Sequence, residues 1–311
     1  MTKKHLALVA VLLTYFLIVF GGYVASSNSG MGCGPEWPMC NGEVVPTLKG
    51  ATLIEYLHRV IGAILGVISI LLFFTLIKKG RRVSLVGNSM LVLLVIQVLL
   101  GAVVVVRDLP SGIISIHLLI AMIFLACLIW IWRYLTLEER ANQLFVTEGK
   151  QKTVIMHLNT LLVLLLATLA FGAYIKHQSY GLACGWFGCR QSFLPSSIPE
   201  LLQTVHRALA IVSTLYICVL AYWSFKKRWG TGLQKRLLLS MLIVILQLII
   251  GVAVVMSYIN ISVAVLHLAI GTGIFALVSE ARVYVGSAMI KSDRSAVLNR
   301  GWHNDRRSLD D

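Results

Sequence analysis

Long runs of apolar residues recur along the chain, and short polar segments separate them. A helix that crosses the hydrocarbon core of a bilayer needs roughly 17–25 residues that are mostly apolar. Eight runs meet this requirement, so the pattern predicts an all-α membrane protein with eight transmembrane helices. The predicted spans lie near residues 6–26, 54–77, 86–107, 112–135, 153–175, 201–224, 234–257 and 261–283.

The composition agrees with this prediction, because 58% of the 311 residues are hydrophobic and only 13% are charged. A soluble domain typically carries about 25% charged residues, so too few polar side chains remain to cover a surface that faces water. The first run resembles a signal peptide, since Lys3 and Lys4 precede it. A similar run at 153–175 lies in mid-chain, where no cleavage is expected. We therefore interpret the first run as a retained helix.

The formal net charge of +14 reflects orientation in the membrane rather than binding to nucleic acid. If the N-terminus lies in the cytoplasm, 21 of the 27 Lys and Arg residues fall in cytoplasmic segments. Only Lys49, Arg107, Lys176 and Arg190 then fall in outer loops. Cytoplasmic segments of membrane proteins carry such an excess of basic residues. We expect a multi-pass protein of the cell membrane with both termini in the cytoplasm and no nucleic-acid partner.

The chain contains an internal repeat with an offset near 150 residues, and unlike residue types match across all four helices of each half. The matched segments are 20–24 with 171–175, His58-Arg59 with His206-Arg207, Gln97 with Gln247, Gly101 with Gly251, and His117 with His267. Each copy has an even number of spans, so both copies face the same way. The repeat predicts two four-helix bundles related by a pseudo-two-fold axis along the membrane normal. The expected units are 1–145, 146–284 and a cytoplasmic tail at 285–311.

Four histidines lie inside predicted spans, where ionisable side chains are rare and usually functional. They are His58, His117, His206 and His267, and each lies about five residues, or roughly 7 Å, inside the outer end of its helix. Each half thus holds two imidazoles at one depth on different helices, as two axial ligands of a heme iron require. Structural histidines are one alternative. A zinc or copper site is another, although these metals more often recruit Cys or carboxylate ligands as well.

Two arginines, Arg59 and Arg207, directly follow histidines of this set. Snorkelling of the guanidinium to the membrane interface is the simpler interpretation. Pairing with the propionates of a bound heme is the alternative.

Four of the six cysteines fall in the outer loops after the first and fifth spans, as the pairs Cys33/Cys40 and Cys184/Cys189. The outer face of a cell membrane is oxidising, so we expect a structural disulfide in each loop. A reactive thiol pair is the alternative. A CxxC metal site is disfavoured, because neither spacing fits it.

One acidic residue distinguishes the halves, because Gln203 stands where the first half has Glu55. Glu55 precedes His58 by three residues, which puts both on one helix face. An acid in the first helical turn is favoured by the helix macrodipole, and this is one interpretation. The other is a general base or charge stabiliser. Presence in only one copy of a duplicated site favours chemistry in that copy.

The eight spans, the paired loop cysteines, the Glu55-x-x-His58 motif and the three other histidines together resemble the heme A synthase family in its compact bacterial form. The resemblance covers nearly the whole chain up to about residue 284. It implies a bacterial membrane enzyme that oxidises a ring methyl of heme O to a formyl group, through a hydroxymethyl intermediate. Heme O synthase and an electron acceptor are the expected partners.

The resemblance also implies roles for individual residues. It makes His206 and His267 the ligands of a resident heme b, and His58 and His117 the pair that holds substrate heme. It makes Glu55 the catalytic carboxylate, and it places a Cys33–Cys40 disulfide near the substrate site. An iron with two His ligands has no open coordination position, so we expect heme b to transfer electrons and water to supply the oxygen.

Two other functions fit the same helices and histidines. One is a di-heme cytochrome b-type subunit that transfers electrons without modifying heme, and the other is a heme carrier. The difference between Glu55 and Gln203 favours the enzyme, because an electron-transfer subunit has no evident use for it.

The distribution of basic residues makes a testable prediction of topology. Reporter fusions after residues 80, 145 and 230 should report the cytoplasm, and fusions near 42, 110 and 190 should report the outside. Alkaline phosphatase and fluorescent-protein reporters measure these two outcomes. A single inverted loop would contradict the common depth assigned to the four histidines.

Overall fold

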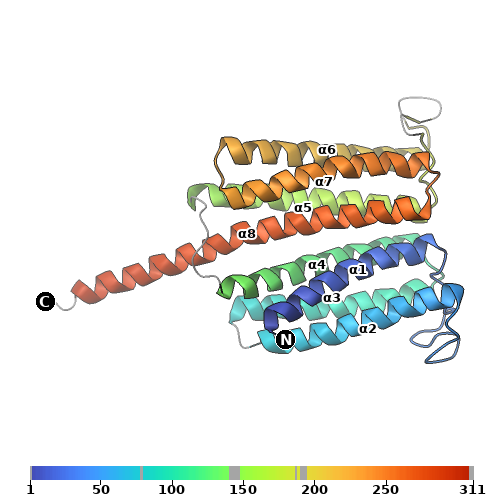
Figure 1. Ribbon diagram of the computed structural model, residues 1–311, viewed down its shortest axis with the longest axis horizontal. Helices are drawn as coiled ribbons and strands as arrows, with labels where there is room; N and C mark the ends of the chain where they lie inside the picture. Colours follow the sequence, from blue (N-terminus) through green and yellow to red (C-terminus); the bar gives the residue numbers. More distant parts are fainter. Residues whose placement is uncertain (1, 78–79, 140–147, 186–187, 190–194, 308–311) are drawn as a thin grey trace.

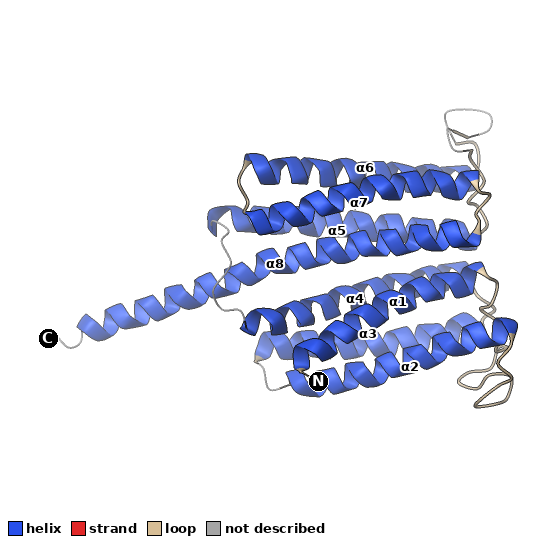
Figure 2. Cartoon of the chain, viewed as in Figure 1, coloured by secondary structure: helices blue, strands red, loops and turns tan. Residues whose placement is uncertain are grey.

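The computed structural model describes residues 2–77, 80–139, 148–185, 188–189 and 195–307. Within these residues the chain forms eight helices joined by loops, with two isolated β-bridges in the loops (Figure 2). The helices are α1 Lys3–Ser26, α2 Gly50–Leu76, α3 Arg81–Val106, α4 Ser111–Glu139, α5 Glu148–His177, α6 Ile198–Lys226, α7 Thr231–Met256 and α8 Ile261–Arg307.

All eight helices of this described part are long and apolar enough to cross a membrane, which confirms the predicted all-α fold class. A helix satisfies its own backbone hydrogen bonds, and this makes it suitable for a hydrocarbon environment. All six prolines lie between 35 and 46, at 110, or at 195 and 199, outside the helix interiors where they would break this pattern. Helix α8 continues to Arg307 and projects beyond the other helices toward the C-terminus (Figure 1).

Each group of four consecutive helices closes into a bundle. Helix α1 packs against α2, α2 against α3, and α3 against α4, while α4 also contacts α1. Helices α5 to α8 repeat this pattern of neighbours. The two bundles lie side by side, with α1, α4, α5 and α8 between them (Figure 1). The pseudo-two-fold relation between the bundles stays a prediction.

The connections between helices repeat as well. Gly80 and Gly230 precede α3 and α7 with φ angles of +99° and +98°, a conformation that favours glycine because it lacks a Cβ atom. The turns before α4 and α8 each place two consecutive residues at positive φ, namely Asp108-Leu109 and Tyr258-Ile259. Both copies of the repeat therefore use the same backbone turns at 150-residue spacing.

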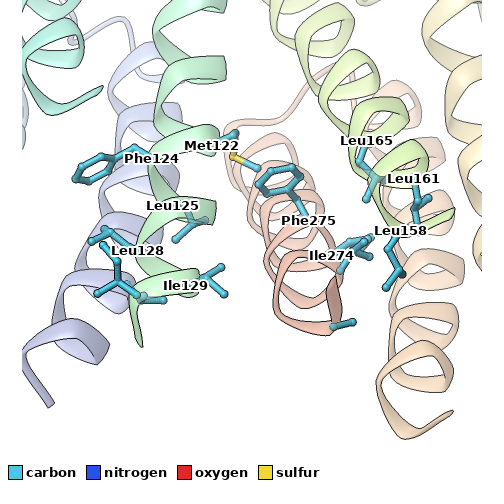
Figure 3. Packing of buried hydrophobic residues seen from close by; sticks show 14 of the residues in the cluster. Met122, Phe124, Leu125, Leu128, Ile129, Leu158, Leu161, Leu165, Ile274 and Phe275 are labelled. Atoms are coloured by element: carbon cyan, nitrogen blue, oxygen red, sulfur yellow. The ribbon is translucent and has the colours of Figure 1, made fainter. Parts of the chain in front are cut away.

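Apolar side chains fill the space between the bundles, as Figure 3 shows for α4, α5 and α8. Met122 and Leu125 from α4, Phe275 from α8 and Leu158 from α5 are almost fully buried there. Burial of each such side chain contributes roughly 1.5–3 kcal/mol where the alternative is water. In lipid, close packing and dispersion supply the stabilisation instead.

Polar contacts also join the two bundles. The Tyr15 hydroxyl on α1 donates to the carbonyl oxygen of Ala269 on α8 at 2.9 Å. Near the other end of the bundle, Glu280 on α8 pairs with Arg236 on α7 and with Arg133 on α4 at 3.0 Å. One carboxylate thus connects its own bundle with the other and fixes their relative position.

Candidate functional site

The four predicted site histidines occupy matching positions in the two bundles. His58 and His206 stand eight residues after the first residues of α2 and α6, and His117 and His267 stand six residues after those of α4 and α8. His58 interacts electrostatically with His117 in the first half, and His267 does so with His206 in the second. The structure therefore brings the histidines together in pairs within each half.

A glycine on a neighbouring helix packs against each imidazole. The pairs are Gly21–His58, Gly172–His206, Gly101–His117 and Gly251–His267. A Cβ atom on these glycines would stand 3.1, 2.9, 3.4 and 3.1 Å, respectively, from Cε1 of the facing ring. Carbon atoms pack best at about 3.5–4.0 Å. Each glycine therefore leaves the room that its imidazole occupies.

The second-half histidine on α6 has a fixed orientation. Its Nδ1 atom donates a hydrogen bond of 2.9 Å to the backbone carbonyl oxygen of Thr168 on α5. A carbonyl oxygen only accepts, so this bond places the proton on Nδ1 and leaves a lone pair on Nε2 of His206. Metal-ligating histidines are commonly held in this way by the ring nitrogen that does not bind the metal. His58, its counterpart, has a buried Nδ1 atom without a hydrogen-bond partner.

Glutamines from α3 and α7 approach the remaining two imidazoles. The amide nitrogen of Gln97 lies 3.0 Å from Nε2 of His117. The amide nitrogen of Gln247 lies 3.4 Å from Nε2 of His267 and 3.0 Å from that residue's backbone oxygen. The Nδ1 atoms of both histidines are buried and have no hydrogen-bond partner.

These nitrogens show what kind of group the site can hold. Buried polar atoms in proteins are nearly always hydrogen-bonded, so three unpartnered Nδ1 atoms are unusual. Among the described residues, no group of three or more His, Cys, Asp or Glu side chains could hold a metal ion. Two imidazoles alone suit an iron whose other four ligands come from a porphyrin. The residues present therefore fit a heme in each half better than zinc or copper.

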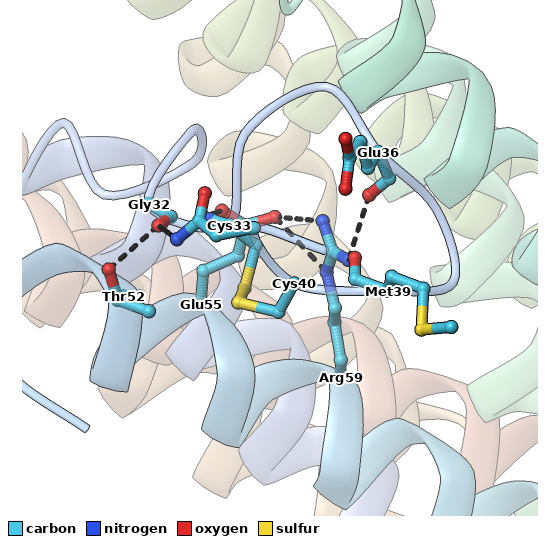
Figure 4. A network of polar contacts seen from close by, with 9 residues as sticks. Gly32, Cys33, Glu36, Met39, Cys40, Thr52, Glu55 and Arg59 are labelled. Atoms are coloured by element: carbon cyan, nitrogen blue, oxygen red, sulfur yellow. Dashed lines mark hydrogen bonds and ion pairs between the residues drawn. A yellow bond between two sulfur atoms is a disulfide. The ribbon is translucent and has the colours of Figure 1, made fainter. Parts of the chain in front are cut away.

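Glu55 is the centre of a polar network beneath the loop between α1 and α2 (Figure 4). The backbone N–H of Cys33 donates to its Oε2 atom at 2.8 Å. The Arg59 guanidinium donates to its Oε1 atom from Nε at 3.1 Å and from Nη2 at 2.5 Å. The same guanidinium donates to the backbone oxygens of Glu36 and Met39 inside the loop. This network ties the loop to α2 directly above His58.

The first helical turn of α2 contains no acidic residue, because α2 begins at Gly50 rather than near 54. Glu55 therefore lies in the second turn, where it is 4% exposed. The interpretation of this carboxylate as an acid favoured by the macrodipole in a first turn is wrong. Its ion pair and its bond to the loop explain its position instead.

The second half reproduces the loop contact without the charge. The backbone N–H of Cys184 donates to Oε1 of Gln203 at 2.6 Å, and the amide of Gln203 donates to the backbone oxygen of Gly181 at 2.7 Å. Arg207 has no carboxylate within ion-pair distance among the described residues, and its one hydrogen bond is a 3.5 Å contact to the Cys184 oxygen. Arg59 is thus neutralised, and Arg207 is not.

Both expected loop disulfides are present. Cys33 is bonded to Cys40 and Cys184 to Cys189, with S–S distances of 2.02 and 2.04 Å. Each disulfide belongs to the loop that Glu55 or Gln203 holds from below. These loops therefore lie at the N-terminal ends of α2 and α6, where the first histidine of each pair is located.

Sequence reasoning missed the contacts that surround the imidazoles. Interhelical hydrogen bonding and close helix packing were expected of Gln97 and Gln247, and the structure shows that the bonding partners of both amides are histidines. The available signal was a repeated pattern, in which a Gly stands four residues and a His twenty residues after each Gln. On α3 and α7, Gln and Gly four residues apart share one helix face, so this pattern directs both at the histidine.

Eight helices able to cross a membrane, with two of these histidines in each four-helix bundle, define a class of histidine-bearing multi-pass membrane proteins. The chain belongs to the COX15-CtaA family of cytochrome oxidase assembly proteins, whose family model matches residues 4–52 and 47–279. It is therefore a multi-pass membrane protein of that family.

Its relatives match it over nearly their whole length. The chain is 30% identical to a heme A synthase of Bacillus licheniformis over 274 residues, which cover 85% of this chain and 89% of the relative. It is 26% identical to a heme A synthase of Exiguobacterium sp., with 91% and 93% covered. It is 28% identical to a heme A synthase of Alkalihalophilus pseudofirmus, with 85% and 90% covered.

Proposed function

We propose that this protein is a heme A synthase, an oxidoreductase that converts a ring methyl group of heme O into the formyl group of heme A. The observation that carries the proposal is the full-length similarity to heme A synthases, combined with a histidine pair in each half. The sites face the outer side of the membrane in this proposal, with both termini in the cytoplasm. Conversion of methyl to formyl removes four electrons and adds one oxygen atom. In this proposal water supplies the oxygen, four protons are released, and the electrons pass to an external electron acceptor.

The two halves have different tasks in this proposal. His206 and His267 ligate a resident heme b, which supplies electron transfer when it is bound. The hydrogen bond from His206 to Thr168 supports this assignment, because it presents a ring nitrogen in a fixed direction. Arg207 is the propionate partner in this half, since no carboxylate of the residues that the structure describes pairs with its guanidinium. Four of the five N–H donors of Arg59 are already in use.

His58 and His117 hold substrate heme O in the first half, and Glu55 accepts a proton during oxidation of the ring methyl. A carboxylate offers about four acceptor positions, and three on Glu55 receive hydrogen bonds. The remaining position, on Oε2, is where Glu55 would receive the proton. Arg59 and the Cys33 N–H keep the carboxylate fixed below the loop, and the disulfide restricts the loop above it.

Heme extraction from Glu55→Gln cells tests this function. Gln203 shows that an amide at this position keeps the loop contact, so the change removes charge and basicity while the loop stays in place. General base catalysis contributes about 10²–10⁴-fold, and heme A formation should fall by that order. Cells that make heme O should accumulate heme A with the natural chain, and heme O or its hydroxymethyl derivative with the variant.

The spectrum of heme b in the second half should not change in Glu55→Gln, because Glu55 lies in the other bundle. Near-normal heme A from this variant would exclude Glu55 as the base. If the natural chain yields no heme A at all, the protein is instead a heme carrier or a di-heme electron-transfer subunit.

Gly172 provides a test of the resident heme that does not alter a ligand. Gly172→Ala places a methyl group 2.9 Å from Cε1 of His206 and forces the ring to move. Overpacking of this kind costs about 1–3 kcal/mol, which lowers heme affinity by about fivefold to more than 100-fold. The low-spin heme b absorption of purified protein measures the loss.

Gly66→Ala is the matched control, because no atom lies within 4 Å of a Cβ added to this helical glycine. It should leave the heme b absorption unchanged. Full heme b content in Gly172→Ala would show that His206 does not ligate iron.

A further inference from the structure

The two glutamines that approach the histidines differ in what their amides bind. Gln97 directs its amide nitrogen at Nε2 of His117, 3.0 Å away. Its counterpart Gln247 makes its shorter bond, of 3.0 Å, to the backbone oxygen of His267 and stands 3.4 Å from the ring nitrogen. Equivalent residues of the repeat therefore differ: Gln97 caps the imidazole alone, and Gln247 divides its amide between the backbone oxygen and a longer contact with the imidazole.

An amide nitrogen only donates hydrogen bonds, so Nε2 of His117 must accept through its in-plane lone pair. A heme iron takes that same lone pair from an imidazole. The amide of Gln97 and an iron atom therefore compete for one position. The proton of this imidazole is then on Nδ1, which is buried without a partner.

We propose that Gln97 is a displaceable cap on His117, which occupies the ligand position while the first half is empty and yields it to incoming heme. This inference rests on the proposed function, in which the first half exchanges heme O for heme A. By stabilising the empty site, the cap weakens net binding and speeds release. Gln247 makes its shorter bond to a backbone oxygen, so it caps the ring of His267 more weakly and yields more readily to a heme that stays.

The other histidine of each pair, His58 or His206, also differs between the halves in its hydrogen bonding. The backbone oxygen of Thr168 orients His206, whereas Nδ1 of His58 has no partner. In the second half a backbone oxygen therefore accepts a hydrogen bond at each histidine position. The Thr168 oxygen accepts from the ring of His206, and the oxygen of His267 itself accepts from the amide of Gln247. In the first half, among the described residues, Gln97 provides the one hydrogen bond to the ring of His58 or His117.

A hemin titration of the purified full-length protein, with heme b retained in the second half, tests this cap. Gln97→Leu removes the amide at similar side-chain volume, and Gln97→Asn shortens it beyond reach of His117. A neutral hydrogen bond changes an equilibrium by about 2- to 10-fold. Both variants should bind hemin in the first half tighter by that factor, and transfer of hemin to excess apomyoglobin should slow.

Gln247→Leu is the matched control and should leave the first-half titration unchanged. The heme b absorption of each variant reports that the bundle is folded. Unchanged or weaker hemin binding in folded Gln97→Leu and Gln97→Asn would overturn the cap, because the amide would then not compete with iron. If hemin uptake persists in a His58→Ala/His117→Ala variant, these histidines do not bind heme and the proposed function of the first half fails with it.

Discussion

The absence of water in a hydrocarbon core is the constraint on which this structure depends. A polar group there needs a partner within the protein or in a bound ligand. Hydroxyl groups meet this need locally, as Ser69 and Thr214 do by donating to the carbonyl four residues earlier in their helices. An imidazole reaches no such acceptor on its own helix. The pairing of histidines across helices, the glycines that make room for them and the unpartnered ring nitrogens all agree with a ligand that completes the site.

The same constraint explains how a duplicated frame supports two different sites. Both halves use one loop, one disulfide and one side chain at position 55 or 203 to hold the loop to the helix below. A carboxylate in the first half pairs with Arg59, and an amide stands in its place in the second, where Arg207 has no carboxylate partner within the described part of the chain. A few polar side chains therefore distinguish the halves, while the helices, turns and glycines stay alike.

Most of the fold could be predicted from the sequence, because eight apolar runs and a repeat at 150 residues depend only on composition and order. Helix ends were less predictable, since hydropathy does not register polar residues that continue a helix at the interface. The start of α2 at Gly50 moved Glu55 out of the first turn for this reason. The four histidines were found from depth and repetition, and the loop disulfides from the oxidising outer face.

Contacts between helices could not be predicted, because they depend on how each helix is rotated about its axis. Gln97 and Gly101 were visible as repeated residues, yet only the packing of α3 against α4 shows that both meet His117. Arg59 is a similar case. Its sequence position indicated the interface or a propionate, which stay predictions, and it gave no sign of the contacts that the guanidinium makes with the carboxylate of Glu55 and two loop oxygens.

The central claim is that each histidine pair holds a different heme, and the heme content of two double variants tests it most directly. Hemes extracted from purified proteins and separated by chromatography give the result. The His58→Ala/His117→Ala variant should retain heme b and lack heme O and heme A, and His206→Ala/His267→Ala should lack heme b. The opposite distribution, or unchanged heme content in either folded variant, would contradict the division of labour between the halves.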